Sequence, residues 1–291
     1  MTAMLIQTYR YAVENREELL KPLDSIINRK FYESAEKAWI EQEPNAMEER
    51  IAAIDSSWNY VKFQGYYLYA VECVSVFADN SFVTEPLCEV GLDTMSVNEG
   101  DGKIAYNPSL WLQSKGMSFE YELAIKSLDS ARYVLVDGSL LARYYDRRQR
   151  KTVEFYEHAR ELMNKENLIF VAKTSESNAM LGGTMGDIHY FNRATKKAGY
   201  SRPYYDSVGI TIFYARLDDY EPCLKVEVPG KLSEDQCRRV FGIIGTKRFN
   251  GYPYCLRLAH QRCKLTIEDM ERLSNVLGLD IEPGERKVLN E

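Results

Sequence analysis

The chain has 291 residues, 45% of them hydrophobic and 27% charged, which is enough for one large soluble domain or two small ones. Its formal charge of −6 shows no overall basic excess of the kind typical of nucleic-acid-binding proteins, so any such surface would have to be a local patch. The six cysteines form no CxxC pair, the N-terminus lacks a signal-peptide stretch, and no apolar run spans a membrane, which predicts a cytoplasmic protein with reduced thiols.

The predicted elements begin with helices and continue into strands. Residues 1–48 alternate charged and apolar positions at helical spacing, which predicts two amphipathic helices with a break near Pro22. A β-rich part follows. Its runs Ile51–Asp55, Tyr66–Phe77 and Phe82–Val90 are expected to form an antiparallel meander of three strands.

The middle of the chain alternates helices and strands. A polar loop over residues 98–109 precedes a helix over residues 116–130, whose apolar side chains recur at helical spacing. A strand then ends at Asp137, and a basic helix runs from Arg143 towards Met163. Residues 168–172 form the next apolar run, which predicts a buried strand.

The last part of the chain adds two strands and then helices. Val208–Ala215 and Cys223–Val228 are predicted to be an antiparallel pair. Capping-box patterns at residues 233–236 and 266–269 each open a helix.

The order of these elements indicates the fold class. Three strands, helix, strand, helix and strand, with further helices at both ends, match a mixed α/β sheet of the ribonuclease-H-like type. We expect one domain over residues 1–291. It would have N-terminal helices in residues 1–48, the core in 49–230 and a C-terminal helical part in 231–291.

Two apolar runs end on an aspartate, at Asp55 and at Asp137. A residue at the tip of a buried strand faces the crevice where ligands of α/β sheets bind. Two such tips on adjacent strands would place two carboxylates side by side, and these repel unless a cation lies between them. The alternative is that Asp-Ser-Ser and Asp-Gly-Ser are turns or helix caps, and the pairing favours the metal hypothesis.

A helix and a C-terminal motif supply further candidates. Glu120 would complete an oxygen-rich site suited to Mg²⁺ or Mn²⁺, while Glu122, on another helical face, is its rival. His260 follows Tyr252 by about two helical turns, so both side chains can face one cleft. An imidazole there would ligate a metal or relay a proton, although a single helical histidine is more often structural or exposed.

Basic residues offer contacts to phosphate. Lys173, at the end of its strand, would neutralise a phosphate in the transition state, or is a surface lysine. A locally basic run is either a phosphate track for DNA or a solvated helix face: Arg143, Arg147, Arg148 and Arg150. No GxxxxGK[ST] motif is present, so we expect no ATP hydrolysis and no nucleotide cofactor.

Five motifs in one order resemble the NurA nuclease family, which is associated with archaeal DNA double-strand-break end processing. They are IDSS, FEYELA, VLVDGSL, FVAKTSES and GYPYCLRLAH, and the resemblance spans roughly residues 51–264. The sequence departs from the family at Ser56, where a glycine is expected. The chain is also on the short side, which implies reduced peripheral insertions for guiding DNA.

The resemblance assigns roles to residues of this sequence. It implies that the metal-binding carboxylates are Asp55, Glu120 and Asp137. It places the tyrosine and histidine of the C-terminal motif at Tyr252 and His260. Lys173 falls in a stretch that resembles the family's Lys-Thr-Ser segment.

The resemblance also implies a function. It implies a homodimeric, Mn²⁺-dependent nuclease, with Mg²⁺ as the alternative ion, that acts as a 5′-to-3′ exonuclease and single-strand endonuclease. Its substrates would be single-stranded DNA and duplex ends during end resection and recombinational repair. Its partner would be the hexameric HerA translocase, which supplies the ATPase. The rival hypotheses are a non-catalytic ribonuclease-H-like adaptor that dimerises and docks on the translocase, and a metal-dependent phosphatase.

Overall fold

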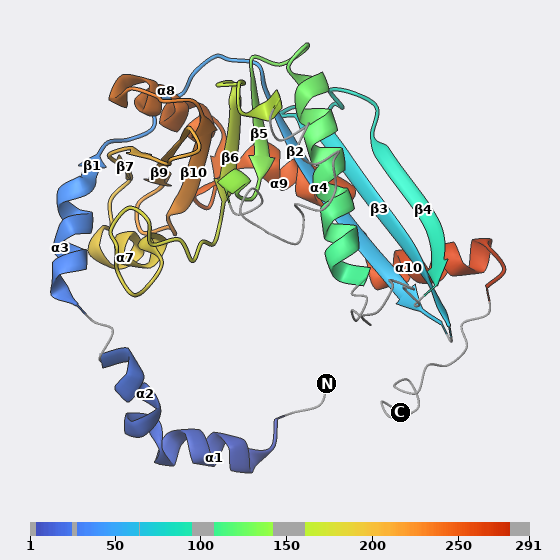
Figure 1. The fold of residues 1–291 in the computed structure, drawn as a ribbon, viewed down its shortest axis with the longest axis horizontal. Coiled ribbons are helices and arrows are strands. Elements are labelled where there is room, and N and C mark those ends of the chain that lie inside the picture. The colour runs from blue at the N-terminus through green and yellow to red at the C-terminus, as the bar shows by residue number, and fades with distance from the viewer. Residues whose placement is uncertain (1–3, 25–27, 64, 95–107, 142–160, 280–291) are drawn as a thin grey trace.

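The computed structural model describes residues 4–24, 28–63, 65–94, 108–141 and 161–279 (Figure 1). Its helices are α1 (Ile6–Glu14), α2 (Arg16–Asp24), α3 (Arg29–Ala38), α4 (Pro108–Ser127), α7 (Asp187–Ala194), α8 (Glu234–Gly245), α9 (Tyr254–Cys263) and α10 (Ile267–Val276). None of these described helices is long and apolar enough to cross a bilayer.

A ten-stranded mixed sheet runs through the described residues, in the order β1-β7-β9-β10-β6-β5-β2-β3-β4, with β8 paired to β9. The strands are β1 (Trp39–Glu41), β2 (Ile51–Lys62), β3 (Tyr66–Phe77), β4 (Leu87–Thr94), β5 (Tyr133–Asp137), β6 (Leu168–Ala172), β7 (Gly199–Ser201), β8 (Tyr204–Tyr205), β9 (Ile210–Arg216) and β10 (Leu224–Pro229). A separate short pair joins β11 (Arg248–Phe249) to β12 (Tyr252–Pro253). In the large sheet, β2, β5 and β6 are mutually parallel and the other pairs are antiparallel.

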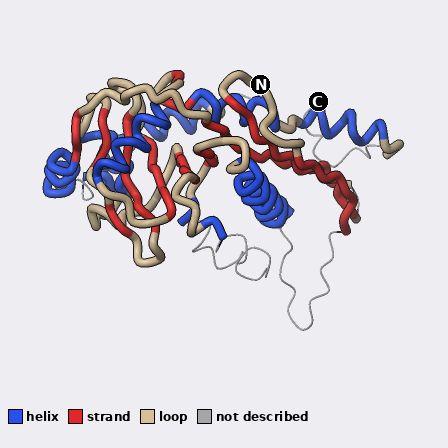
Figure 2. Tube along the Cα trace, turned by 90° about the horizontal axis from the view of Figure 1, so that it is seen from above, coloured by secondary structure: helices blue, strands red, loops and turns tan. Residues whose placement is uncertain are grey.

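The central strands are apolar because both of their faces are covered. On β2, Ala52 and Ile54 pack in one core cluster with α4, whereas Ile51 and Ala53 pack in another with α8 and α9. This alternation across a doubly covered strand explains the continuous apolar runs. In Figure 2, seen from above, α4 appears end-on at one side of the strands, and the helices that precede the C-terminus lie at the other.

The ribonuclease-H-like arrangement predicted from the sequence is confirmed, with a mixed sheet flanked by helices. The predicted pair of late strands is also confirmed as β9 and β10, which are antiparallel. Ser233 and Thr266 each form the predicted capping box, at the start of α8 and α10. The shorter strands β1, β7, β8, β11 and β12 were not predicted, since runs this short carry little periodicity.

Several predicted boundaries were wrong: the helix predicted over residues 116–130 begins at Pro108, and residues 4–48 form three described helices instead of two. The first strand does not turn after Asp55, because β2 stays paired with β3 as far as Lys62. The third strand does not start at Phe82, which forms only an isolated bridge; Pro86 lacks the N–H that an earlier ladder would need. Pro22 lies within α2, and the helix break falls instead at Asn15, whose side chain and backbone cap α1.

Candidate functional site

Asp55 and Asp137 lie on neighbouring parallel strands. The pairing of β2 with β5 runs as far as Ile54 opposite Val136, so the two aspartates are the next residues along each strand. Alternation turns both towards the face covered by α9, because the residues two positions earlier pack in that core cluster. The structure therefore brings these two carboxylates together, with Asp55 inside a long strand and Asp137 at the end of a short one.

Asp55 is a buried carboxylate held by His260. Only 6% of the residue is exposed, and its Oδ2 lies 2.8 Å from Nδ1 of His260 on α9. Burial first, and then the charges of Glu120 and Asp137, raise the pKa of Asp55 to about 6, against the opposing effect of His260. The raised pKa means that burial and the two neighbouring carboxylates together disfavour the charged form of Asp55, and that His260 offsets this only in part.

Glu120 reaches the site from the opposite face of β2. It is 3% exposed, and its Oε1 accepts a 2.5 Å hydrogen bond from the hydroxyl of Ser56. Gly116, one turn earlier on α4, permits this close approach, since a Cβ there would lie 2.8 Å from the Ser56 oxygen. Glu122 is instead partly exposed and pairs with Lys126 on its own helix. Of the two candidate glutamates, the structure brings Glu120 to the aspartates.

Lys173 and Tyr252 lie beside Asp137. The Lys173 amine donates a 3.1 Å hydrogen bond to Oδ2 of Asp137 and lies 4.4 Å from the centre of the Tyr252 ring. The Tyr252 hydroxyl is buried and interacts with the side chain of Asp137. Burial and the nearby charge of Asp137 hold the pKa of Tyr252 far above its ordinary range. A buried hydroxyl placed in this way can orient a further polar group.

These donors fit a hard divalent cation in chemistry and charge. Carboxylate oxygens and imidazole are suitable ligands for Mn²⁺ or Mg²⁺, and a cation would relieve the repulsion felt by Asp55. As they stand, Asp55, Glu120 and Asp137 are held separately, by His260, Ser56 and Lys173. In the described ranges no three His, Cys, Asp or Glu side chains lie close enough together to hold one ion, so binding requires these side chains to move towards one another.

The sequence analysis did not predict one contact of the site, and one element that it did predict lies outside the described residues. Ser56 was noted only as a departure from glycine, whereas its hydroxyl holds Glu120. Strand alternation was the available signal, because a residue next to Asp55 must face the opposite side. The basic run of Arg143, Arg147, Arg148 and Arg150 lies outside the described residues.

The chain resembles known proteins over most of its length. The profile of the NurA domain matches residues 49–265. A DNA double-strand break repair nuclease NurA of Sulfurisphaera tokodaii is 23% identical over 335 residues, covering 96% of this chain and 98% of that one. The crystal structure of the NurA nuclease from Sulfolobus solfataricus matches with a TM-score of 0.75 at 19% identity, covering 97% of this chain and 100% of that one. A crystal structure of NurA bound to dAMP and manganese matches with a TM-score of 0.68 at 11% identity, covering 94% and 98%.

Proposed function

The chain belongs to the NurA family, since the domain match spans most of its length, and from this premise we propose that it is a metal-dependent deoxyribonuclease. The observation that carries the proposal is the convergence of three carboxylates and an imidazole. Asp55, Glu120, Asp137 and His260 come from β2, α4, β5 and α9, and their charges act on one another. Such a set is suited to metal-assisted hydrolysis of a phosphodiester.

In this proposal Asp55, Glu120 and Asp137 hold the ion, and His260 is a candidate fourth ligand. Manganese is the first choice, supported by the manganese found in NurA structures, and Mg²⁺ is the alternative. A bound ion would supply Lewis-acid stabilisation of the phosphate and lower the pKa of the attacking water. Asp55 is poised for this role because a cation would remove the cost of keeping its buried carboxylate ionised.

The other groups bind and orient the substrate. Lys173 is half-exposed, so its amine offers positive charge to a phosphate oxygen at the open edge of the site. The buried hydroxyl of Tyr252 orients the same phosphate beside Asp137. His260 either ligates the ion or carries the proton of the attacking water, and its hydrogen bond to Asp55 fixes the ring for both tasks.

The finer proposal is a 5′-to-3′ exonuclease and single-strand endonuclease that resects DNA ends for recombinational repair. It would act as a homodimer with a HerA-type hexameric translocase. The N-terminal helices support a partner contact, because α1 buries none of its residues and exposes a series of apolar side chains: Ile6, Tyr9, Tyr11 and Val13. The same observation favours the second candidate, an adaptor that docks without cleaving DNA.

Cleavage of DNA decides between these two functions. We expect the purified chain, incubated with labelled single-stranded and duplex DNA, to degrade both with Mn²⁺ and neither with excess EDTA. The physical reason is that without a cation the gathered carboxylates repel the phosphate instead of binding it. Products are resolved on a denaturing gel, and restored cleavage after Mn²⁺ is added back is the control.

Other outcomes identify the rivals. DNA left intact at every ion concentration, with phosphate released from monoesters, would point to a phosphatase. If neither substrate reacts while a complex with the translocase still forms, the adaptor is correct and the nuclease proposal is wrong.

A matched pair of glutamates tests the ligand assignment. We expect Glu120→Gln to lower the Mn²⁺-dependent cleavage rate about 100-fold, because it removes a charge that faces the ion. Glu122→Gln should change the rate by no more than about twofold, because a partly exposed ion pair contributes little. Initial rates at saturating Mn²⁺ measure both, and equal rates for the two variants would contradict the assignment.

A further inference from the structure

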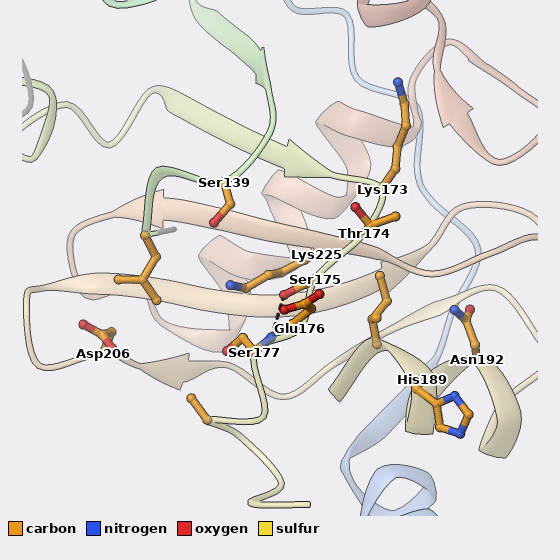
Figure 3. A pocket seen from close by; sticks show the side chains of 13 residues that line it. Ser139, Lys173, Thr174, Ser175, Glu176, Ser177, His189, Asn192, Asp206 and Lys225 are labelled. Carbon is orange, nitrogen blue, oxygen red and sulfur yellow. Dashed lines mark hydrogen bonds between the residues drawn. The ribbon is translucent and has the colours of Figure 1, made fainter. Parts of the chain in front are cut away.

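A cavity of about 850 Å³ adjoins the site at the carboxyl ends of β5 and β6. The segments that follow these two strands form its walls, with Ser139 on one side and Lys173–Ser177 on the other. In Figure 3, Lys225 extends from the sheet between Ser139 and Ser175. Lys225 is only 2% exposed, which is unusual for a lysine and requires a physical reason.

Lys225 is paired with Glu227, two residues further along β10. Its amine lies 2.6 Å from Oε1 of Glu227, and the two side chains are 2% and 1% exposed. Glu227 also accepts hydrogen bonds from the Ser139 hydroxyl (2.8 Å) and from the backbone N–H of Leu141 (2.9 Å). This one carboxylate therefore holds two points of the segment that directly follows Asp137.

The segment that follows β6 is held by a second buried carboxylate. Asp187, which is 1% exposed, accepts backbone hydrogen bonds from Met180 (2.9 Å) and Leu181 (3.0 Å). Burial raises the pKa of Asp187, and the two backbone hydrogen bonds oppose this more strongly than the charge of Lys225 does. Lys225 is therefore paired with the carboxylate that holds the wall after β5, whereas Asp187 holds the chain just beyond the other wall.

Such a pair is a costly way to stabilise a core. Apolar side chains of similar volume are often as stabilising as a buried ion pair, because desolvation offsets the attraction. What apolar residues cannot do is accept the hydrogen bonds of Ser139 and Leu141. At Gly138 the backbone leaves the strand with φ +103° and donates a 2.9 Å hydrogen bond to Val171. From there the chain is tied to Glu227, which fixes the direction in which β5 ends.

We propose that Lys225 and Glu227 are positioning residues that hold the turn after β5, and through it the carboxylate of Asp137, in the orientation that binds the divalent ion. This inference rests on the proposed function of the site. Groups that orient metal ligands typically affect metal affinity about 10- to 100-fold when they are changed. Neither residue needs to touch the ion or the substrate.

The test measures manganese binding without DNA. Free Mn²⁺ is quantified by electron paramagnetic resonance in titrations of metal-free wild type, Glu227→Gln and Lys225→Met. We expect both variants to bind Mn²⁺ about tenfold more weakly. Hydrogen exchange should be faster over residues 138–141, because the hydrogen bond to the Leu141 N–H is weakened, while exchange across the rest of the sheet stays unchanged.

Removing one partner of the buried pair leaves the other charge unpaired, which can impair folding. Two further variants test the proposal without that effect. Ser139→Ala removes the hydrogen bond to Glu227 and no charge, and we expect Mn²⁺ binding about threefold weaker with a melting temperature only a few degrees lower. The matched control is Lys197→Met. Lys197 forms a 2.6 Å pair with Asp219, which also accepts a backbone N–H, but this pair is exposed and lines neither the site nor the cavity. Its Mn²⁺ affinity should equal that of the wild type.

The outcomes separate this inference from the proposed function. A wild type that binds no Mn²⁺ overturns both. A wild type that binds Mn²⁺, together with Ser139 and Glu227 variants of equal affinity, overturns the positioning role alone. Faster exchange throughout the chain in the Glu227 and Lys225 variants, with unchanged Mn²⁺ affinity in Ser139→Ala, would mean that the pair serves only stability.

Discussion

Asp137→Asn is expected to lower the rate of Mn²⁺-dependent DNA cleavage by about 1,000-fold or more, the order of magnitude for losing a charge that stabilises a phosphoryl-transfer transition state. The substitution removes one negative charge and keeps the shape of the side chain. It also leaves Lys173 without its carboxylate partner, so positive charge remains where the ion would bind. Both effects oppose metal binding, and initial cleavage rates across a range of Mn²⁺ concentrations measure them.

The fold should survive this change. Asp137 is the last residue of β5, and the Lys173 amine that it contacts is half-exposed, so the stability change should be under about 1 kcal/mol. Asp129→Asn is the matched control, because the same chemical change is made at an exposed residue beyond the end of α4. Circular dichroism and melting curves should be the same for both variants. Full cleavage by Asp137→Asn would remove this residue from the site.

Asp55→Asn is expected to lower the cleavage rate as much as Asp137→Asn does. We also expect it to stabilise the metal-free protein. The folded pKa of about 6 lies above the ordinary value of 3.8, so the folded state holds the proton more tightly than the unfolded state. Stability from this group is present below about pH 4 and is lost as pH rises through 6. Above that pH the ionised Asp55 costs on the order of 3 kcal/mol, a cost that asparagine does not carry.

The measurement is urea unfolding in EDTA at a series of pH values. The variant and the wild type should unfold with equal free energies near pH 4, and the variant should be about 2 kcal/mol more stable at pH 7.5. Added Mn²⁺ should then stabilise the wild type more than the variant, because only the wild type keeps the full ligand set. A metal-free variant less stable than the wild type at pH 7.5 would show that the contacts of Asp55 outweigh the cost of its burial and of the neighbouring carboxylates.

Local sequence pattern was sufficient for much of the fold. The apolar runs of β5 and β6, the capping boxes at Ser233 and Thr266 and the antiparallel pair of β9 and β10 follow from the chemistry of a few adjacent residues. Local pattern failed at the extent of β2. The Asp-Ser-Ser sequence is compatible with a turn, but eleven paired positions with β3 keep the chain extended.

For the candidate site, too, some features follow from the sequence and others only from the tertiary structure. The sequence by itself determined which residue types could carry the chemistry, since apolar runs ending at Asp55 and Asp137 and a helical His260 are visible in one dimension. Only the tertiary structure decided which glutamate faces the aspartates, because both are compatible with the helix. The contact of Ser56 on β2 with Gly116 and Glu120 on α4 distinguishes them. It alone also tied the turn after Asp137 to Glu227, 86 residues beyond Leu141. Periodicity reports the face on which a side chain lies, whereas strand order and helix packing determine what that face meets.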